Sequence, residues 1–423
     1  MPGSGRLHAH GARIVGGTRF ERNPPGRAFR GVRVRVSRGR ARLPRAAGSG
    51  SWTLVTTRNE SAPLVVYGTD CSYYTGKLEA YLRAKGIAYR LEPFNERNMR
   101  RAARHTGVIQ IPQVECPDGS WLADTTLILD YFERTRPAPS ITPADPATAF
   151  ASRLIEDYAD EWLWRPAMHY RWSFPTTAAL MSAWLAEHVT EQRAPQWAKR
   201  LFWRRRQYGT FVKGDGVTPA TCVAVEAAYL DTLATLEPIF ASRPFVLGER
   251  PTPADFGFMA PLFRHFFCDP APGRIMRERA PGVHEWVARV WNLRPERVDA
   301  MPTPERIPDD LGRLFATIAE VYLPYLDANA AAYAKGAKVV TYDVRGTPIT
   351  EPVKPYRVWC RDRLRAELLR LENAARTSVE RTLGADATAR LAQPSPKPVE
   401  NLILELPLTA PRQPKPVDSW WRR

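Results

Sequence analysis

Hydrophobic and polar positions between residues 62 and 136 change period several times, as expected of a domain that mixes strands and helices. Short apolar runs separated by turn residues predict strands at 64–68, 87–92, 114–116 and 121–123. Stretches with a helical period predict helices from about 72 to 85, from 95 to 105 and from 124 onward. The predicted order βαβαββα is that of a thioredoxin-like domain, and the predicted fold class is α+β.

The pattern from residue 147 to 300 is helical. Phe150, Leu154, Tyr158 and Trp162 recur every four residues, after a linker at 137–146 that contains four prolines. Similar patterns fill 177–190, 192–208, 222–241 and 283–293. Thr252 and Asp255 have the spacing of a capping box at the start of an apolar helix. These features predict a second, all-helical domain.

Residues 301–390 predict a helix-hairpin-helix extension. A helix over 309–336 should break near Pro324, a hairpin over 339–350 should turn at Arg345-Gly346, and another helix should span 355–385. Residues 391–423 contain seven prolines, which predicts a Pro-rich tail that lies extended over the surface.

The positive charge of the chain is concentrated at its start. Residues 1–60 contain 13 Arg, no Lys and two Glu, so they carry +11 of the net charge of +17. This predicts a disordered Arg-rich arm over 1–61 or a misassigned start, with a transit peptide or a polyanion-binding arm as alternatives. We therefore predict no nucleic-acid partner for the folded part. Lys199-Arg200 and 204–206 are interpreted as a solvated helix face.

The other compositional signals indicate a protein of the cytoplasm. Five scattered cysteines argue against a disulfide framework and for free thiols. No apolar run approaches the length of a membrane span, and no His, Cys, Asp or Glu spacing predicts a metal site.

Three segments together resemble the glutathione S-transferase superfamily: Leu64 to Ser72, Ile111-Pro112-Gln113-Val114, and the helix start at 124–131. The resemblance covers about 62–294 and implies that glutathione is bound as a co-substrate. It implies a cis peptide before Pro112, with the backbone of Ile111 facing the cysteinyl unit of glutathione. It also implies that Asp124 and Thr125 receive the γ-glutamyl end, although both residues could simply cap their own helix.

The group that activates the glutathione thiol is predicted at the start of the first helix. Counting back from Lys85-Gly86-Ile87, the family spacing falls on Ser72, whose hydroxyl would hold the thiolate by a hydrogen bond. Cys71 is one position earlier and would instead form a mixed disulfide. A helix cap is the alternative for Ser72, and a small buried residue for Cys71. Tyr67, Tyr73 and Tyr74 are weaker candidates for the donor.

The second substrate is expected to be a hydrophobic electrophile. Trp162, Arg165 and His169 belong to an aromatic-rich segment where the resembled fold places that substrate, although core and dimer contacts would explain the same segment. The hypothesis is a homodimeric glutathione transferase. Because 72–83 also resembles metaxin-like and failed-axon-connections-like members, a non-catalytic interaction protein is the main alternative, and a Cys71-dependent thiol reductase is another.

Overall fold

The computed structural model describes residues 62–399 and 405–412. The predicted Arg-rich arm and the last eleven residues of the predicted tail lie outside these ranges.

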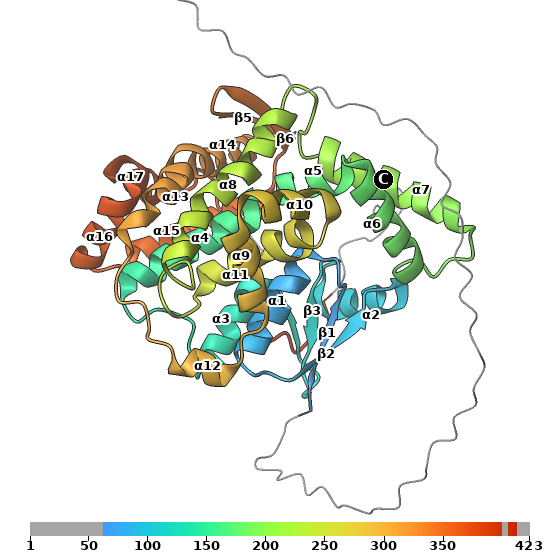
Figure 1. Cartoon of the computed structure of the whole chain (residues 1–423), viewed down its shortest axis with the longest axis horizontal. Helices are drawn as coiled ribbons and strands as arrows, with labels where there is room; N and C mark the ends of the chain where they lie inside the picture. Colours follow the sequence, from blue (N-terminus) through green and yellow to red (C-terminus); the bar gives the residue numbers. More distant parts are fainter. Residues whose placement is uncertain (1–61, 400–404, 413–423) are drawn as a thin grey trace, which may run out of the picture. The chain divides into compact units, whose positions relative to one another are not determined.

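The first part of the described chain is a four-stranded mixed sheet with helices on it (Figure 1). Its elements are β1 (Leu64–Gly68), α1 (Tyr73–Ala84), β2 (Tyr89–Pro93), α2 (Glu96–Thr106), β3 (Gln113–Glu115), β4 (Trp121–Ala123) and α3 (Thr125–Thr135). The strand order is β2-β1-β3-β4, with β2 parallel to β1 and the other neighbours antiparallel. The predicted βαβαββα order is therefore confirmed.

The next part is helical, as predicted. Its elements are α4 (Pro146–Trp162), α5 (Trp164–Trp172), α6 (Pro175–His188), α7 (Gln196–Tyr208), η1 (Gly209–Lys213), α8 (Cys222–Ser242), α9 (Pro253–Pro261), η2 (Leu262–Phe267), α10 (Pro270–Arg279), α11 (Pro281–Trp291) and α12 (Pro295–Ala300). Thr252 and Asp255 form the predicted capping box at the start of α9, and both are fully buried.

The C-terminal extension consists of helices around a hairpin. Its elements are η3 (Asp309–Leu311), α13 (Gly312–Thr317), η4 (Ile318–Tyr322), α14 (Leu323–Ala334), β5 (Val339–Val344), β6 (Thr347–Pro352), α15 (Pro355–Leu369), α16 (Asn373–Leu383) and α17 (Ala385–Ala392). Arg345 and Gly346 make the hairpin turn, with φ of 51° and 86°. The single helix predicted over 355–385 is instead two helices, because the chain turns at 370–372.

The extension covers one side of α4. Trp162 on α4 packs against the rings of Tyr322, Tyr325 and Tyr342, all from the extension. Farther on, Leu408 pairs with Trp121, exchanging N–H to O bonds of 2.9 and 2.8 Å. This contact covers the edge of β4 that β3 leaves open, and it protects that edge from pairing with other chains.

All five cysteines are free, as predicted. Among the helices of the described ranges, we find none that combines the length and the apolar character needed to cross a bilayer.

Candidate active site

The sheet register brings the predicted binding residues to one edge. Tyr67, Gln113 and Ala123 lie side by side on β1, β3 and β4. Because β3 runs antiparallel to both neighbours, the end of β1, the start of β3 and the end of β4 share that edge. Ser72 follows β1, Pro112 precedes β3 and Thr125 follows β4. Three segments that are distant in the sequence therefore reach the same end of the sheet.

Ser72 is the N-cap residue of α1. Its Oγ accepts a hydrogen bond of 3.3 Å from the backbone N–H of Thr75, and its side chain is half-buried. A serine hydroxyl has two acceptor lone pairs and one donor proton. Capping uses an acceptor, so the proton is available for a further acceptor such as a thiolate. The capping and donor roles considered for Ser72 are thus compatible.

Cys71 lies in an environment that favours the neutral thiol. Burial raises the pKa of Cys71, and the nearby Arg171 and the Thr69 hydroxyl, 3.6 Å from Sγ, only partly oppose this. Reactive cysteines need the opposite shift, because the thiolate is the nucleophile. Arg171 instead donates to the backbone carbonyl of Cys71 at 2.5 Å and pairs with the buried Asp269. This arrangement ties the turn before α1 to the helical domain.

The Ile111–Pro112 peptide bond is cis, as the resemblance implied. Within the described ranges, neither the N–H nor the C=O of Ile111 takes part in a hydrogen bond. Gln113 holds this loop: its fully buried amide donates to the carbonyls of Val108 and Gln110 at 2.9 and 2.8 Å. Sequence reasoning missed Gln113, although a polar residue in a buried strand is a usable signal. The free backbone of Ile111 can pair with an extended peptide.

Asp124 caps α3 and is also bound by the extension. Its Oδ1 accepts from the N–H groups of Thr126 and Leu127, at 3.1 and 3.3 Å. Its Oδ2 accepts from the Tyr356 hydroxyl of α15 at 2.7 Å. Burial raises the pKa of Asp124, and these hydrogen bonds reduce that shift. The helix-capping role considered for Asp124 is therefore present, and Tyr356 is an unpredicted neighbour of the site.

Thr125 is the first residue of α3, and it is buried. In the part of the chain that the structure covers, its hydroxyl has no hydrogen-bond partner. The first backbone N–H groups of a helix have no partner within that helix, and they favour anions. Because Asp124 already accepts from the N–H groups of Thr126 and Leu127, the Thr125 hydroxyl is the donor left for a ligand carboxylate at the start of α3.

Lys77 links the two helices whose N-termini lie at this edge. Its ammonium group on α1 donates to Glu156 of α4 at 2.7 Å and to Thr126 of α3 at 3.3 Å, and it also contacts Asp160. Lys77 and Glu156 are fully buried. The spacing of α1 and α3, and hence of Ser72 and Thr125, depends on this charged cluster.

The three tyrosines considered as donors are already hydrogen-bonded. Tyr67 donates to Glu115 at 2.7 Å, Tyr73 to the Ala159 carbonyl at 2.7 Å and Tyr74 to the Asp160 carbonyl at 3.1 Å. Each hydroxyl has a single proton, so none can donate to a ligand while these bonds persist.

The residues predicted for the second substrate are joined to other partners. Trp162 packs against the extension, and Arg165 donates to Glu351 at 2.9 Å and to Tyr342. His169 is hydrogen-bonded to Glu226 and Ser173, both at 2.9 Å. None of these contacts connects the three side chains to Ser72, Pro112 or Thr125.

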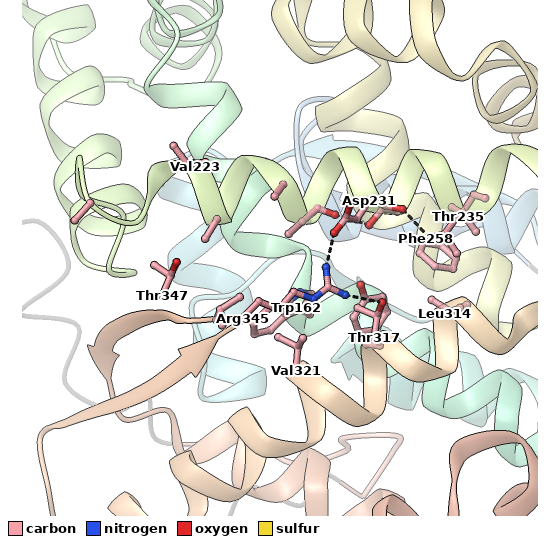
Figure 2. A pocket seen from close by; sticks show the side chains of 18 residues that line it. Trp162, Val223, Asp231, Thr235, Phe258, Leu314, Thr317, Val321, Arg345 and Thr347 are labelled. Carbon is pink, nitrogen blue, oxygen red and sulfur yellow. Dashed lines mark hydrogen bonds and ion pairs between the residues drawn. The ribbon is translucent and has the colours of Figure 1, made fainter. Parts of the chain in front are cut away.

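A cavity of about 240 Å³ lies between α4, α8, α13 and the β5–β6 hairpin. Figure 2 shows Arg345 reaching across it to Asp231 at 2.6 Å and to Thr317 at 3.3 Å. Its wall includes Trp162, which lies about 120° around α4 from Glu156 and about 160° from Asp160, the two acids that hold Lys77. The cavity is therefore on the side of α4 away from α1, and a thiolate at Ser72 would not face it.

No cluster of His, Cys, Asp and Glu suited to a metal ion occurs within residues 62–399 and 405–412.

Comparison with known proteins finds two matching domain families. The glutathione S-transferase N-terminal domain matches residues 71–135, and the glutathione S-transferase C-terminal domain matches residues 226–293. No curated protein matches the chain.

Several solved structures show partial similarity. The beta-etherase LigF from a Sphingobium species is 20% identical, with 54% of this chain and 94% of that chain covered and a TM-score of 0.38. A glutathione S-transferase from Methylobacterium radiotolerans, in complex with glutathione sulfonate, is 19% identical, with 58% and 98% covered and a TM-score of 0.35. One from Ceriporiopsis subvermispora, in complex with glutathione, is 16% identical, with 55% and 98% covered and a TM-score of 0.37.

Because these TM-scores are below 0.5, the assignment rests on the two domain matches. They occur in N-terminal to C-terminal order, the first on the mixed sheet and its helices and the second on the helical part. The chain belongs to the glutathione S-transferase superfamily.

Proposed function

We propose that this protein binds glutathione at the sheet edge formed by Ser72, Ile111 and Thr125 and presents its thiolate to a hydrophobic electrophile. One observation supports the proposal: three segments at one edge of the sheet each retain unused hydrogen-bonding capacity, and each suits one part of glutathione. The Thr125 hydroxyl at the start of α3 suits the γ-glutamyl carboxylate, and the free backbone of Ile111 suits the cysteinyl peptide unit. The Ser72 proton suits the thiolate.

The energetic requirement on Ser72 is modest. A hydrogen bond to a charged group contributes about 1.5–3 kcal/mol, which corresponds to roughly one to two pKa units. The N-terminus of α1 adds about 0.3–1 kcal/mol. Together these effects would bring a thiol pKa from about 8.5 to near 7, so a large fraction would be thiolate at neutral pH. Asp124, oriented by Tyr356, would face the ammonium group of the ligand.

We predict that Ser72→Ala lowers kcat/KM with glutathione and a chlorinated nitroaromatic by about 10- to 100-fold, because it removes the donor to sulfur. The pKa of bound glutathione, read from the pH profile of kcat, should rise by about one to two units. Ser72→Thr is the matched control, since it keeps a hydroxyl and a capping oxygen.

Loss of the cap also lowers stability by about 1 kcal/mol, so activity should be measured well below the unfolding transition. Cys71→Ala should retain activity, because burial keeps that thiol neutral. If Ser72→Ala kept full activity while Cys71→Ala lost thiol exchange with glutathione disulfides, the reductase alternative would replace the transferase.

A second candidate is a glutathione S-transferase-fold protein without catalysis. It is favoured by the bond from Tyr356 to Asp124, which places α15 of the extension directly against the proposed γ-glutamyl position. Retention of the full chain on immobilised glutathione, together with turnover of the nitroaromatic, would exclude this alternative. Absence of binding at millimolar glutathione would support it. Homodimerisation and a cytoplasmic location are further parts of the transferase proposal.

A further inference from the structure

Helix α7 exposes large apolar and basic side chains together. Of its thirteen residues, all of which the structure describes, Trp203 is the buried one. The Trp197 side chain is 70% exposed, and Leu201 and Tyr208 are also exposed. In Figure 1, α7 lies at the outer edge next to α6, against which it packs. Exposing a tryptophan and a leucine to water is costly, and such patches usually mark an interaction surface.

The exposed residues of α7 form an ordered stripe. At about 100° per residue, Trp197, Leu201 and Tyr208 fall within about 40° of one another around the helix. Arg200 and Arg204 border one side of this stripe, and Arg205 borders the other side. We call these six residues the α7 surface. Its apolar centre between arginines is typical of a helix that lies in a membrane interface.

The charge along the chain segment that contains α7 has one sign. Between Glu191 and Asp215 the sequence has seven Arg or Lys and no acidic residue. In the part of the chain that the structure describes, Arg200, Arg204 and Arg205 form no ion pair. A second copy of the same surface would bring like charges together, which argues against self-association through α7. The complementary partner is anionic.

We propose that the α7 surface binds anionic lipid bilayers, with Trp197 and Leu201 inserted at the headgroup level and the flanking arginines on the lipid phosphates. A nucleic acid would satisfy the arginines and could stack on Trp197, but it offers no apolar phase for Leu201. A bilayer accommodates both groups. This role is separate from the glutathione site and depends on no step of the transferase reaction.

Co-sedimentation of the full chain with vesicles tests the proposal. We expect binding to phosphatidylcholine vesicles that contain phosphatidylserine, little binding to pure phosphatidylcholine, and weakening by salt. Arg200→Gln with Arg204→Gln should reduce the partition coefficient by roughly 30-fold, because each cation near such a surface contributes about fivefold. Trp197→Ala should also reduce it, at unchanged net charge.

The matched control is Arg277→Gln with Arg279→Gln, two exposed arginines on α10 that lose the same charge. This pair is needed because the 13 arginines of residues 1–60 can also attract vesicles, so binding by the wild type alone does not locate the site. Equal losses from the α7 and α10 pairs would overturn the proposal. So would an unchanged partition coefficient for Trp197→Ala, or binding to single-stranded nucleic acid without binding to vesicles.

Discussion

Replacing Lys77 with methionine is expected to lower the free energy of unfolding by about 3–5 kcal/mol. The ammonium group is fully buried and has the carboxyls of Glu156 and Asp160 as partners. Methionine fills a similar volume but leaves these buried acids without that cation. Removal of one member of a buried ion pair costs far more than removal of an exposed one, because the remaining charge has lost its contact with water.

The surroundings shift the pKa values of the two acids in opposite directions. Burial alone would raise the pKa of Glu156, but Arg153 and Lys77 outweigh burial and lower it to about 2. The pKa of Asp160 is raised, chiefly by burial and also by the charge of Glu156. Glu156 therefore carries a buried negative charge that Arg153 and Lys77 together compensate. Asp160→Asn is the matched control, and we expect it to cost less than about 1.5 kcal/mol.

Denaturant unfolding, followed by far-UV circular dichroism, measures the free energy of unfolding of both variants. Equal losses of stability, or a loss below about 1 kcal/mol for Lys77→Met, would contradict this account of the cluster. A second readout concerns the site. Because Lys77 joins α1 to Thr126 of α3, its loss should also weaken glutathione binding at temperatures where the variant is still folded.

The elements that local sequence determines agree with the sequence analysis. The cap at Ser72, the turn at Arg345-Gly346 and the capping box at Thr252 each depend on residues within a few positions. Local preferences for turns and caps are strong enough to be read from one sequence. The sheet edge that carries the candidate site follows from the order of such elements.

The contacts that the sequence analysis missed are long-range or lack a local signal. The Tyr356 hydroxyl reaches Asp124 across 232 positions, and no period in the sequence indicates which helix face would cover that carboxyl. The turn between α15 and α16 contains neither glycine nor proline, so the apolar spacing predicted one continuous helix. The aromatic segment around Trp162 signalled burial correctly, but burial does not reveal the partner, which is the extension.

Glu351 is expected to be the residue on which the attachment of the extension depends most. It lies on β6, is 2% exposed, and accepts from Arg165 of α5 at 2.9 Å and from Arg357 of α15 at 3.4 Å. Burial alone would raise the pKa of Glu351, but the two arginines outweigh it and lower the pKa to about 2. Two buried cations from different helices thus share one carboxylate.

The lowered pKa of Glu351 determines the direction in which the stability of the protein should change with pH. The pKa of Glu351 is lower in the folded state than in the unfolded chain, so the carboxylate stabilises the fold above about pH 4.5, and this contribution is lost as the pH falls toward 2. A shift from 4.5 to about 2 corresponds to about 3 kcal/mol. Glu351→Gln should therefore lower the free energy of unfolding by about that amount at pH 6, and the free energies of unfolding of the two proteins should become equal as the pH approaches 2.

Glu156 contributes to acid sensitivity in both proteins, so the difference between their stability curves isolates Glu351. A difference that stayed constant from pH 6 to pH 2 would mean that Glu351 acts through packing, and that its charge does not hold the extension.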